Sequence, residues 1–370
     1  MRIHQTSYGP LLLAVMLSWA SLTALASDIP VFDQAQVAAT EGRYEDVVNL
    51  LTGSIVSGSL DQEDLAVALG NRGIAFSLLE QYDAAYEDLE RAVSLKPDHL
   101  LTLNHLGILA EHVDQDFERA AGWYRRAADL GYPASQVNLG NLFRFGLGVE
   151  RNLPLAVALY EAAAAEDYSV AFVALGEMYM DGMGVEKDFD KGLELLRRGV
   201  DRGVVTGHYY LGLAYSRGEG VGQDYETALL HLREAAIKGH APSQGEIGYM
   251  YRKGFGVDKD FLEAAKWYRL AAEQGDVTAA NRLAWLMATC PIAAVCNGRV
   301  ALEFARFAVG SDRSATNLDS LAAAHARLGE FNRAMEVISE IIAMPTLSES
   351  TQRKYARRLE RYRNGIPFQL

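Results

Sequence analysis

The sequence predicts an all-α protein in which helical hairpins stack side by side into a right-handed α-solenoid. Three observations support this prediction: a motif that recurs every 36 residues, apolar residues spaced to cover one face of a helix, and glycines placed where each helix would end. A fixed period of about 20–50 residues is the sequence signature of a solenoid, because each repeat buries its apolar face on its neighbours. With 370 residues and 49% hydrophobic composition, the chain is long and apolar enough for such an array.

A Gly-x-Gly-Val motif marks the repeat most clearly. Its copies are each 36 residues apart and begin at Gly146, Gly182, Gly218 and Gly254. A Leu-Gly or Ile-Gly pair recurs in the same register, with its glycine at Gly140, Gly176, Gly212 and Gly248. Four copies in one register exclude a chance match and predict four equivalent structural units.

Each unit is predicted to form two helices joined by the glycine motif. In "SQGEIGYMYRKG" the large residues fall at positions i, i+3 and i+4, so they share one helical face. Glycine adopts the positive φ that commonly ends a helix, so the motif is interpreted as the turn of a hairpin. A phosphate-binding loop is excluded, because no strand precedes the motif and no Gly-Lys-Ser/Thr follows it. The predicted N-caps of the second helices are Asn152, Asp188, Asp224 and Asp260.

The repeat resembles the Sel1-like repeat, a relative of the tetratricopeptide repeat. The resemblance rests on Leu-Gly-x-x-Tyr/Phe, then Gly-x-Gly-Val, then an Ala-rich second helix. The flanks are similar to ordinary tetratricopeptide units, as in "ALGNRGIAFSLLEQYDAAYEDLERAVSLKPDH". The resemblance implies about nine hairpins without an internal linker. The expected order is a signal peptide (1–26), tetratricopeptide-like repeats (27–134), four Sel1-like repeats (135–278), degenerate repeats (279–344) and a basic capping helix (345–370).

The N-terminus has the pattern of an export signal. Arg2 is followed by the apolar stretch "LLLAVMLSWASLTALA", which ends in the cleavage pattern Ala24-Leu25-Ala26. This stretch is shorter than the roughly 20 residues of a membrane-spanning helix. We therefore expect cleavage after Ala26, a periplasmic or secreted bacterial protein, and no integral membrane span after cleavage. An uncleaved anchor is the alternative.

The two cysteines, Cys290 and Cys296, are predicted to form a disulfide. They lie in "TCPIAAVC", and an exported chain meets an oxidising compartment. The alternatives are weaker, because this spacing is not that of a redox-active Cys-x-x-Cys pair and two thiols alone make a poor zinc site.

Charge and motif content restrict the function. The formal net charge of −13 argues against a nucleic-acid partner, which would require a basic face. No Gly-x-Ser-x-Gly, His-Glu-x-x-His or Cys-x-x-Cys motif occurs. A metal site at His99, His105 and His112 would need further ligands, so surface or groove histidines are the simpler interpretation. We predict no catalytic residues, no metal and no cofactor.

Positions beside each Leu-Gly pair change identity from repeat to repeat, as expected of a surface that binds a partner. The first helix of each hairpin usually lines the concave side of such a stack. Tyrosine and tryptophan there are predicted anchors, because such side chains dominate interface energetics. Packing between adjacent repeats is the alternative for Tyr249 and Trp285. The predicted groove residues are Asn138, Asn141, Glu177, Tyr210, Glu246, Tyr249, Arg282 and Trp285.

The C-terminal helix is a second candidate site, because basic residues concentrate there in an otherwise acidic chain. Tyr355, Leu359 and Tyr362 form an apolar stripe at helical spacing, which predicts that the helix packs on the array. A capping helix with a solvated polar face is one interpretation, and a docking site for an acidic partner or anionic polymer is the other. The docking residues would be Arg353, Lys354, Arg357, Arg358 and Arg361.

These observations predict a non-enzymatic, exported scaffold that binds protein partners in its groove. The resemblance to Sel1-like and tetratricopeptide proteins implies this in class, since a fold does not determine a function. One alternative is a cell-wall or β-lactam-type hydrolase, although the Sel1-like proteins linked to β-lactams carry a disulfide in each repeat and this chain has two cysteines. The other alternative is an envelope polysaccharide-binding protein in an export or assembly complex.

Overall fold

The computed structural model describes residues 30–369, so the expected signal peptide lies outside the described range. All regular structure within that range is helical. The chain divides into two compact units, residues 30–204 and 205–369, which are described one at a time. Their helices make nine hairpins and one final helix, which confirms the predicted all-α fold of stacked hairpins.

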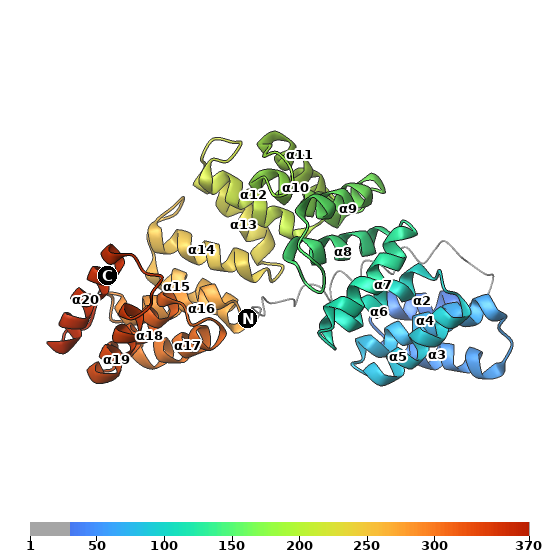
Figure 1. Cartoon of the computed structure of the whole chain (residues 1–370), viewed down its shortest axis with the longest axis horizontal. Coiled ribbons are helices and arrows are strands. Elements are labelled where there is room, and N and C mark those ends of the chain that lie inside the picture. Colours follow the sequence, from blue (N-terminus) through green and yellow to red (C-terminus); the bar gives the residue numbers. More distant parts are fainter. Residues whose placement is uncertain (1–29, 370) are drawn as a thin grey trace. The chain divides into compact units, whose positions relative to one another are not determined.

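The first unit contains five hairpins, drawn in blue to green in Figure 1. In each hairpin a first and a second helix pack along each other, and each hairpin packs on the next. The pairs are α2 (Pro30–Thr40) with α3 (Tyr44–Ser57), α4 (Gln62–Leu78) with α5 (Tyr82–Leu95), α6 (Leu100–His112) with α7 (Phe117–Asp129), α8 (Pro133–Phe145) with α9 (Leu153–Ala165), and α10 (Ser169–Asp181) with α11 (Phe189–Asp201).

The second unit contains four hairpins and a final helix, α20 (Glu349–Arg363), that packs on α19 (Figure 1). Its pairs are α12 (Val205–Arg217) with α13 (Tyr225–Ala236), α14 (Ala241–Lys253) with α15 (Phe261–Glu273), α16 (Val277–Thr289) with α17 (Gly298–Ser311), and α18 (Ala315–Arg327) with α19 (Phe331–Ile342).

The glycine of the Leu-Gly pair lets the two helices of a hairpin approach closely. A methyl group on Gly140 would lie 2.6 Å from Cε1 of Tyr160, and one on Gly248 would lie 2.7 Å from Cδ1 of Tyr268. Both tyrosine side chains are fully buried between the helices. Non-bonded carbon atoms prefer about 3.5–4.0 Å, so a side chain larger than hydrogen does not fit at these positions.

The turns and caps follow the prediction. Gly146, Gly182 and Gly254 end their helices in the left-handed conformation, with φ of 70°, 71° and 76°. The four predicted N-cap side chains each accept a hydrogen bond from a backbone N–H of the first turn of the second helix. One example is Asp188, whose Oδ1 lies 3.0 Å from the backbone nitrogen of Lys191.

The second glycine of the Gly-x-Gly-Val motif has a role beyond the turn. It lies against the backbone at the start of the second helix of the preceding hairpin. A methyl group on Gly184 would lie 2.6 Å from the carbonyl carbon of Leu153, and one on Gly256 would lie 2.7 Å from that of Tyr225. The motif therefore joins hairpins to one another as well as turning the chain.

First helices of consecutive hairpins also contact each other within each unit, as α8 does with α10 and α14 with α16. We call the surface that these helices form the first-helix face. It carries the positions at which the sequence predicted a groove.

We predict that Gly184→Ala destabilises the fold more than Gly203→Ala. Both glycines have positive φ, 75° and 82°, so each alanine meets the same left-handed backbone cost of about 1–2 kcal/mol. A methyl group on Gly203 meets nothing within 4 Å, whereas one on Gly184 collides with Leu153. Overpacking adds about 1–3 kcal/mol to the loss in free energy of unfolding for Gly184→Ala. Urea denaturation of both variants measures the difference, and equal losses would contradict a packing role for Gly184.

Candidate functional site

All eight predicted groove residues lie on the first helices of their hairpins. The three in the first unit are Asn138 and Asn141 on α8 and Glu177 on α10. The five in the second unit are Tyr210 on α12, Glu246 and Tyr249 on α14, and Arg282 and Trp285 on α16.

In the first unit these residues hold helices together. Nη1 of Arg144 donates to Oε2 of Glu177 at 2.8 Å, and both side chains are only 13% exposed. Asn138 donates to Oδ1 of Asn104 at 3.1 Å, which links α8 to α6. Within one hairpin, Oδ1 of Asn141 accepts from the hydroxyl of Tyr160 at 2.7 Å. The polar groups of these residues therefore form hydrogen bonds with other side chains of the first unit. Few of their hydrogen-bonding groups remain to bind a partner.

In the second unit a similar ion pair lies beside an aromatic ring. Glu246 and Arg282, which occupy equivalent positions of successive repeats, pair at 2.8 Å. The guanidinium carbon of Arg282 lies 5.2 Å from the ring centre of Tyr249, and that of Arg252 lies at the same distance. Lys253 adds a third cation at 5.9 Å. Tyr249 is half-buried, so its ring is held in place and still partly accessible. Tyr210 packs edge-on against Tyr209, with their ring centres 5.2 Å apart.

Trp285 connects the first-helix face to α20. Its ring centre lies 5.5 Å from that of Phe368, which follows α20, and 5.0 Å from the guanidinium carbon of Arg358. Arg358 is itself 4.2 Å from the ring centre of Phe368. The guanidinium thus contacts two aromatic rings, and the two sites that the sequence suggested separately meet here.

Arg358 belongs to the packed interior. It is 4% exposed and forms an ion pair with Asp319 of α18, which is also buried. Burial raises the pKa of the Asp319 carboxyl, and the charge of Arg358 opposes that shift. Tyr355 and Tyr362 are buried on the same side of α20, as the apolar stripe predicted. The helix is therefore an integral cap of the second unit.

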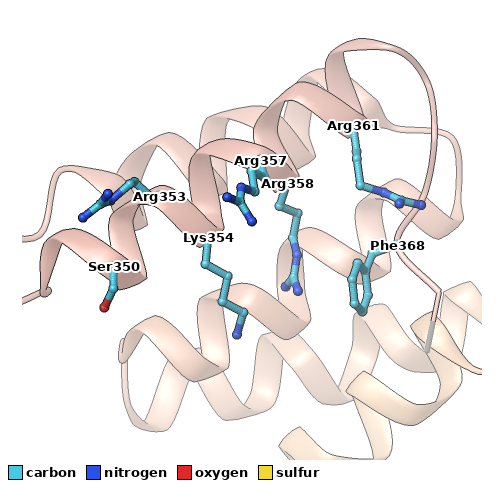
Figure 2. Close-up of a pocket in the computed structure, with 7 residues that line it drawn as sticks. All are labelled: Ser350, Arg353, Lys354, Arg357, Arg358, Arg361 and Phe368. Atoms are coloured by element: carbon cyan, nitrogen blue, oxygen red, sulfur yellow. The ribbon is translucent and has the colours of Figure 1, made fainter.

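The other predicted basic residues surround an open pocket of about 560 Å³. In Figure 2, Lys354, Arg357 and Arg358 extend from α20 toward the pocket, and Phe368 lies at one end. The lining residues are Ser350, Arg353, Lys354, Arg357, Arg358, Arg361 and Phe368.

The positive charges that line the pocket are only partly neutralised by acidic side chains. Arg353 pairs with Glu349 at 3.5 Å, and both side chains are more than 70% exposed, at 73% and 87%. Arg361 donates to the carbonyl oxygen of Pro367 at 3.1 Å. Within residues 30–369, neither Lys354 nor Arg357 has an acidic side chain in ion-pair contact. The pocket therefore presents positive charge to the solvent.

Cys290 and Cys296 lie side by side with their sulfur atoms 3.2 Å apart and no bond between them. Cys290 is buried, and this burial raises the pKa of its thiol to about 11. A thiol with such a pKa is a poor nucleophile at neutral pH, which agrees with a structural role.

Two of the three histidines considered as metal ligands are largely withdrawn from solvent. Burial lowers the pKa of His99 and of His105 to about 4 in each case, so both imidazoles are neutral at pH 7. Among the described residues, no group of three or more His, Cys, Asp or Glu side chains is arranged to hold a metal ion. Likewise, none of the helices in residues 30–369 has the length and apolar character needed to cross a bilayer.

Two features of the site were missed from the sequence. One is the pairing of Arg144 with Glu177, which requires knowing how neighbouring hairpins align. The other is the return of Phe368 onto Trp285. The burial of Arg358 could have been predicted from the sequence. Arg358 lies three residues after Tyr355 and four before Tyr362, so it shares their helical face.

Comparisons with known proteins agree with this architecture. The Sel1 repeat profile matches residues 104–132, 133–168, 171–204, 205–240 and 241–276, and the tetratricopeptide repeat profile matches 66–99. The first of these Sel1 matches lies within residues 27–134, the range predicted to hold tetratricopeptide-like repeats. No curated protein matches the chain in sequence.

Solved structures show the same fold. A Sel1 repeat protein from Oxalobacter formigenes is similar with a TM-score of 0.55 and 26% identity, covering 65% of this chain and 96% of that one. The anaphase-promoting complex assembly Cut9–Hcn1 is similar in fold, with a TM-score of 0.56 and 16% identity over 87% of this chain and 60% of that one. These findings define a helical-repeat protein. The chain contains Sel1 repeats and a tetratricopeptide repeat.

Arg358→Met is predicted to destabilise the second unit strongly. The substitution keeps most of the side-chain volume but leaves Asp319 buried without its partner, which costs about 3–5 kcal/mol in free energy of unfolding. Arg357→Met is the matched control, because Arg357 is exposed one residue away on α20 and its loss is expected to change stability little. Urea denaturation followed by tryptophan fluorescence measures both, and equal stability of the two variants would contradict a structural role for Arg358.

Proposed function

We propose that this protein is a non-enzymatic adaptor that binds a segment of a partner protein on the first-helix face of the second unit. The repeat family supports this class of function, since stacked hairpins present extended binding surfaces. The observation that carries the proposal is that three cations, Arg252, Lys253 and Arg282, surround the half-buried ring of Tyr249.

Tyrosine and arginine dominate the binding energy of many interfaces. Arg282 contacts Tyr249 and pairs with Glu246, so both side chains are already held in place and binding would cost little further side-chain entropy. The variable residues of the first unit instead pair between repeats. A partner segment is therefore expected to lie across α14 and α16.

A non-enzymatic role is supported by where the perturbed titratable groups lie. The groups whose pKa burial shifts most are tyrosines and histidines that pack between helices, such as Tyr124 and His105. Catalysis would require a nucleophile, a base and charge-stabilising donors within mutual reach at a cleft.

Site-specific photo-crosslinking in the producing organism tests the adaptor function. A photo-reactive residue replaces Lys253 on the first-helix face in one variant and Leu270 on the second helix, α15, in the other; both positions are exposed and belong to one hairpin. We expect a defined protein adduct from position 253, none from position 270, and loss of the adduct in a Tyr249→Ala background. Equal adducts at both positions, or none at 253, would contradict the proposal.

We further propose that the protein is exported to the periplasm or beyond, with residues 1–26 removed and Cys290 joined to Cys296. The apolar N-terminal stretch with its Ala-x-Ala pattern supports export, and the adjacent sulfur atoms support the disulfide. The intact mass of the protein recovered from cells checks both. The expected species begins at Ser27 and lacks two hydrogen atoms relative to the dithiol, whereas a chain that retains residues 1–26 and two free thiols would overturn the proposal.

A further inference from the structure

We infer that the basic pocket on α20 binds a short, extended, acidic segment of a partner protein whose carboxylates recur at every second residue. This rests on the proposed adaptor function and names the chemistry of the partner at the C-terminal end of the array. The pocket is the one formed by Ser350, Arg353, Lys354, Arg357, Arg358, Arg361 and Phe368.

The charge of α20 stands out against the rest of the chain. Residues 349–363 contain six Lys or Arg and two Glu, so they carry a formal charge of +4. The whole chain carries −13, so the remainder carries −17. A positive pocket in an acidic protein attracts anionic groups to one place, and the surrounding negative charge repels them elsewhere.

Only one of these six cations is buried in the packing of α20. Arg358 is buried against Asp319, Trp285 and Phe368, so it is needed for the fold. Lys354 and Arg357 are exposed, and among the described residues neither forms an ion pair with an acidic side chain. Both side chains line the pocket (Figure 2).

The spacing of the cations fits an extended peptide. Arg353, Arg357 and Arg361 follow each other at intervals of four residues, which is about 6 Å along a helix. Two residues of an extended chain span about 6.6 Å. Acidic side chains at alternate positions would therefore face successive arginines, while Ser350 and Phe368 lie at the pocket boundary for a polar and an apolar contact.

A short protein segment suits the site better than a long anionic polymer. A polymer that enters the pocket would continue over the acidic remainder of the protein and be repelled there. A segment of a few residues places its charge only where the protein is positive. Exposed charge contacts are screened over about 8 Å at physiological ionic strength, so binding is expected to weaken as salt rises.

Fluorescence anisotropy with the mature protein, residues 27–370, tests the inference. The probe is a labelled peptide of alternating Glu and Ala with one central Phe. One control peptide carries Gln in place of every Glu. The other contains the same residues as the probe, with all Glu in one block. We expect saturable binding of the alternating peptide, at least tenfold weaker binding of the blocked peptide and none of the Gln peptide. Equal binding of the alternating and blocked peptides would overturn the spacing argument.

Two charge-reversed variants on the same helix locate the site. Arg357→Glu changes a pocket residue, whereas Arg363→Glu makes the same charge change at an exposed position outside the pocket. We expect at least a tenfold loss of affinity for Arg357→Glu and less than a twofold change for Arg363→Glu, with both variants folded by circular dichroism. Equal losses of affinity in the two variants would indicate general electrostatic attraction to the helix and would overturn the site. Tighter binding of alginate than of the peptide, at equal carboxylate concentration, would also overturn it.

The outcome is separable from that of the adaptor function. If the peptide fails to bind while the photo-reactive residue at position 253 still captures a protein, the adaptor stands and the acidic-segment site is wrong. If the peptide binds the pocket but position 253 captures nothing, the first-helix face is wrong as the adaptor surface.

Discussion

The close approach of the two helices in each hairpin is the constraint on which the rest of the structure depends. A glycine on the first helix faces a buried side chain of the second, as Gly140 faces Tyr160, Gly248 faces Tyr268 and Gly212 faces Leu232. Any larger residue would push the helices apart and disturb the packing that neighbouring hairpins share. The second glycine of each turn then brings one hairpin against the next, so the recurring residues serve mainly to stack the array.

Residues that change identity from repeat to repeat are not required for this stacking. Their contacts differ between the two units. In the first unit, Glu177 and Asn138 pair with side chains of the preceding hairpin. In the second unit, Glu246 and Arg282 make the equivalent pair, but Tyr249 remains partly accessible beside it. Further along, Trp285 and Arg358 tie α20 to α16. Tyr249, Trp285 and the cations of the pocket thus lie on α14, α16 and α20 of the second unit.

The fold was predictable because its determinants are local and repeated. Gly182 ends a helix through its own φ, and Asp188 caps the next helix within three residues, so each is visible in a short stretch of sequence. The site was only partly predictable. The positions on the first helices follow from the period, but the pairing of Arg144 with Glu177 depends on the alignment of two hairpins. The contact between Trp285 and Phe368 joins residues 83 apart through side-chain packing, and no local pattern encodes it.

The most direct test is hydrogen–deuterium exchange of residues 27–370 with and without the alternating Glu-Ala peptide. If the recurring residues build the stack and the binding surface lies on the second unit, exchange in α20 and α16 slows when the peptide is bound. Exchange in residues 30–204 is then expected to stay unchanged. Protection spread over both units, or confined to residues 30–204, would contradict this expectation.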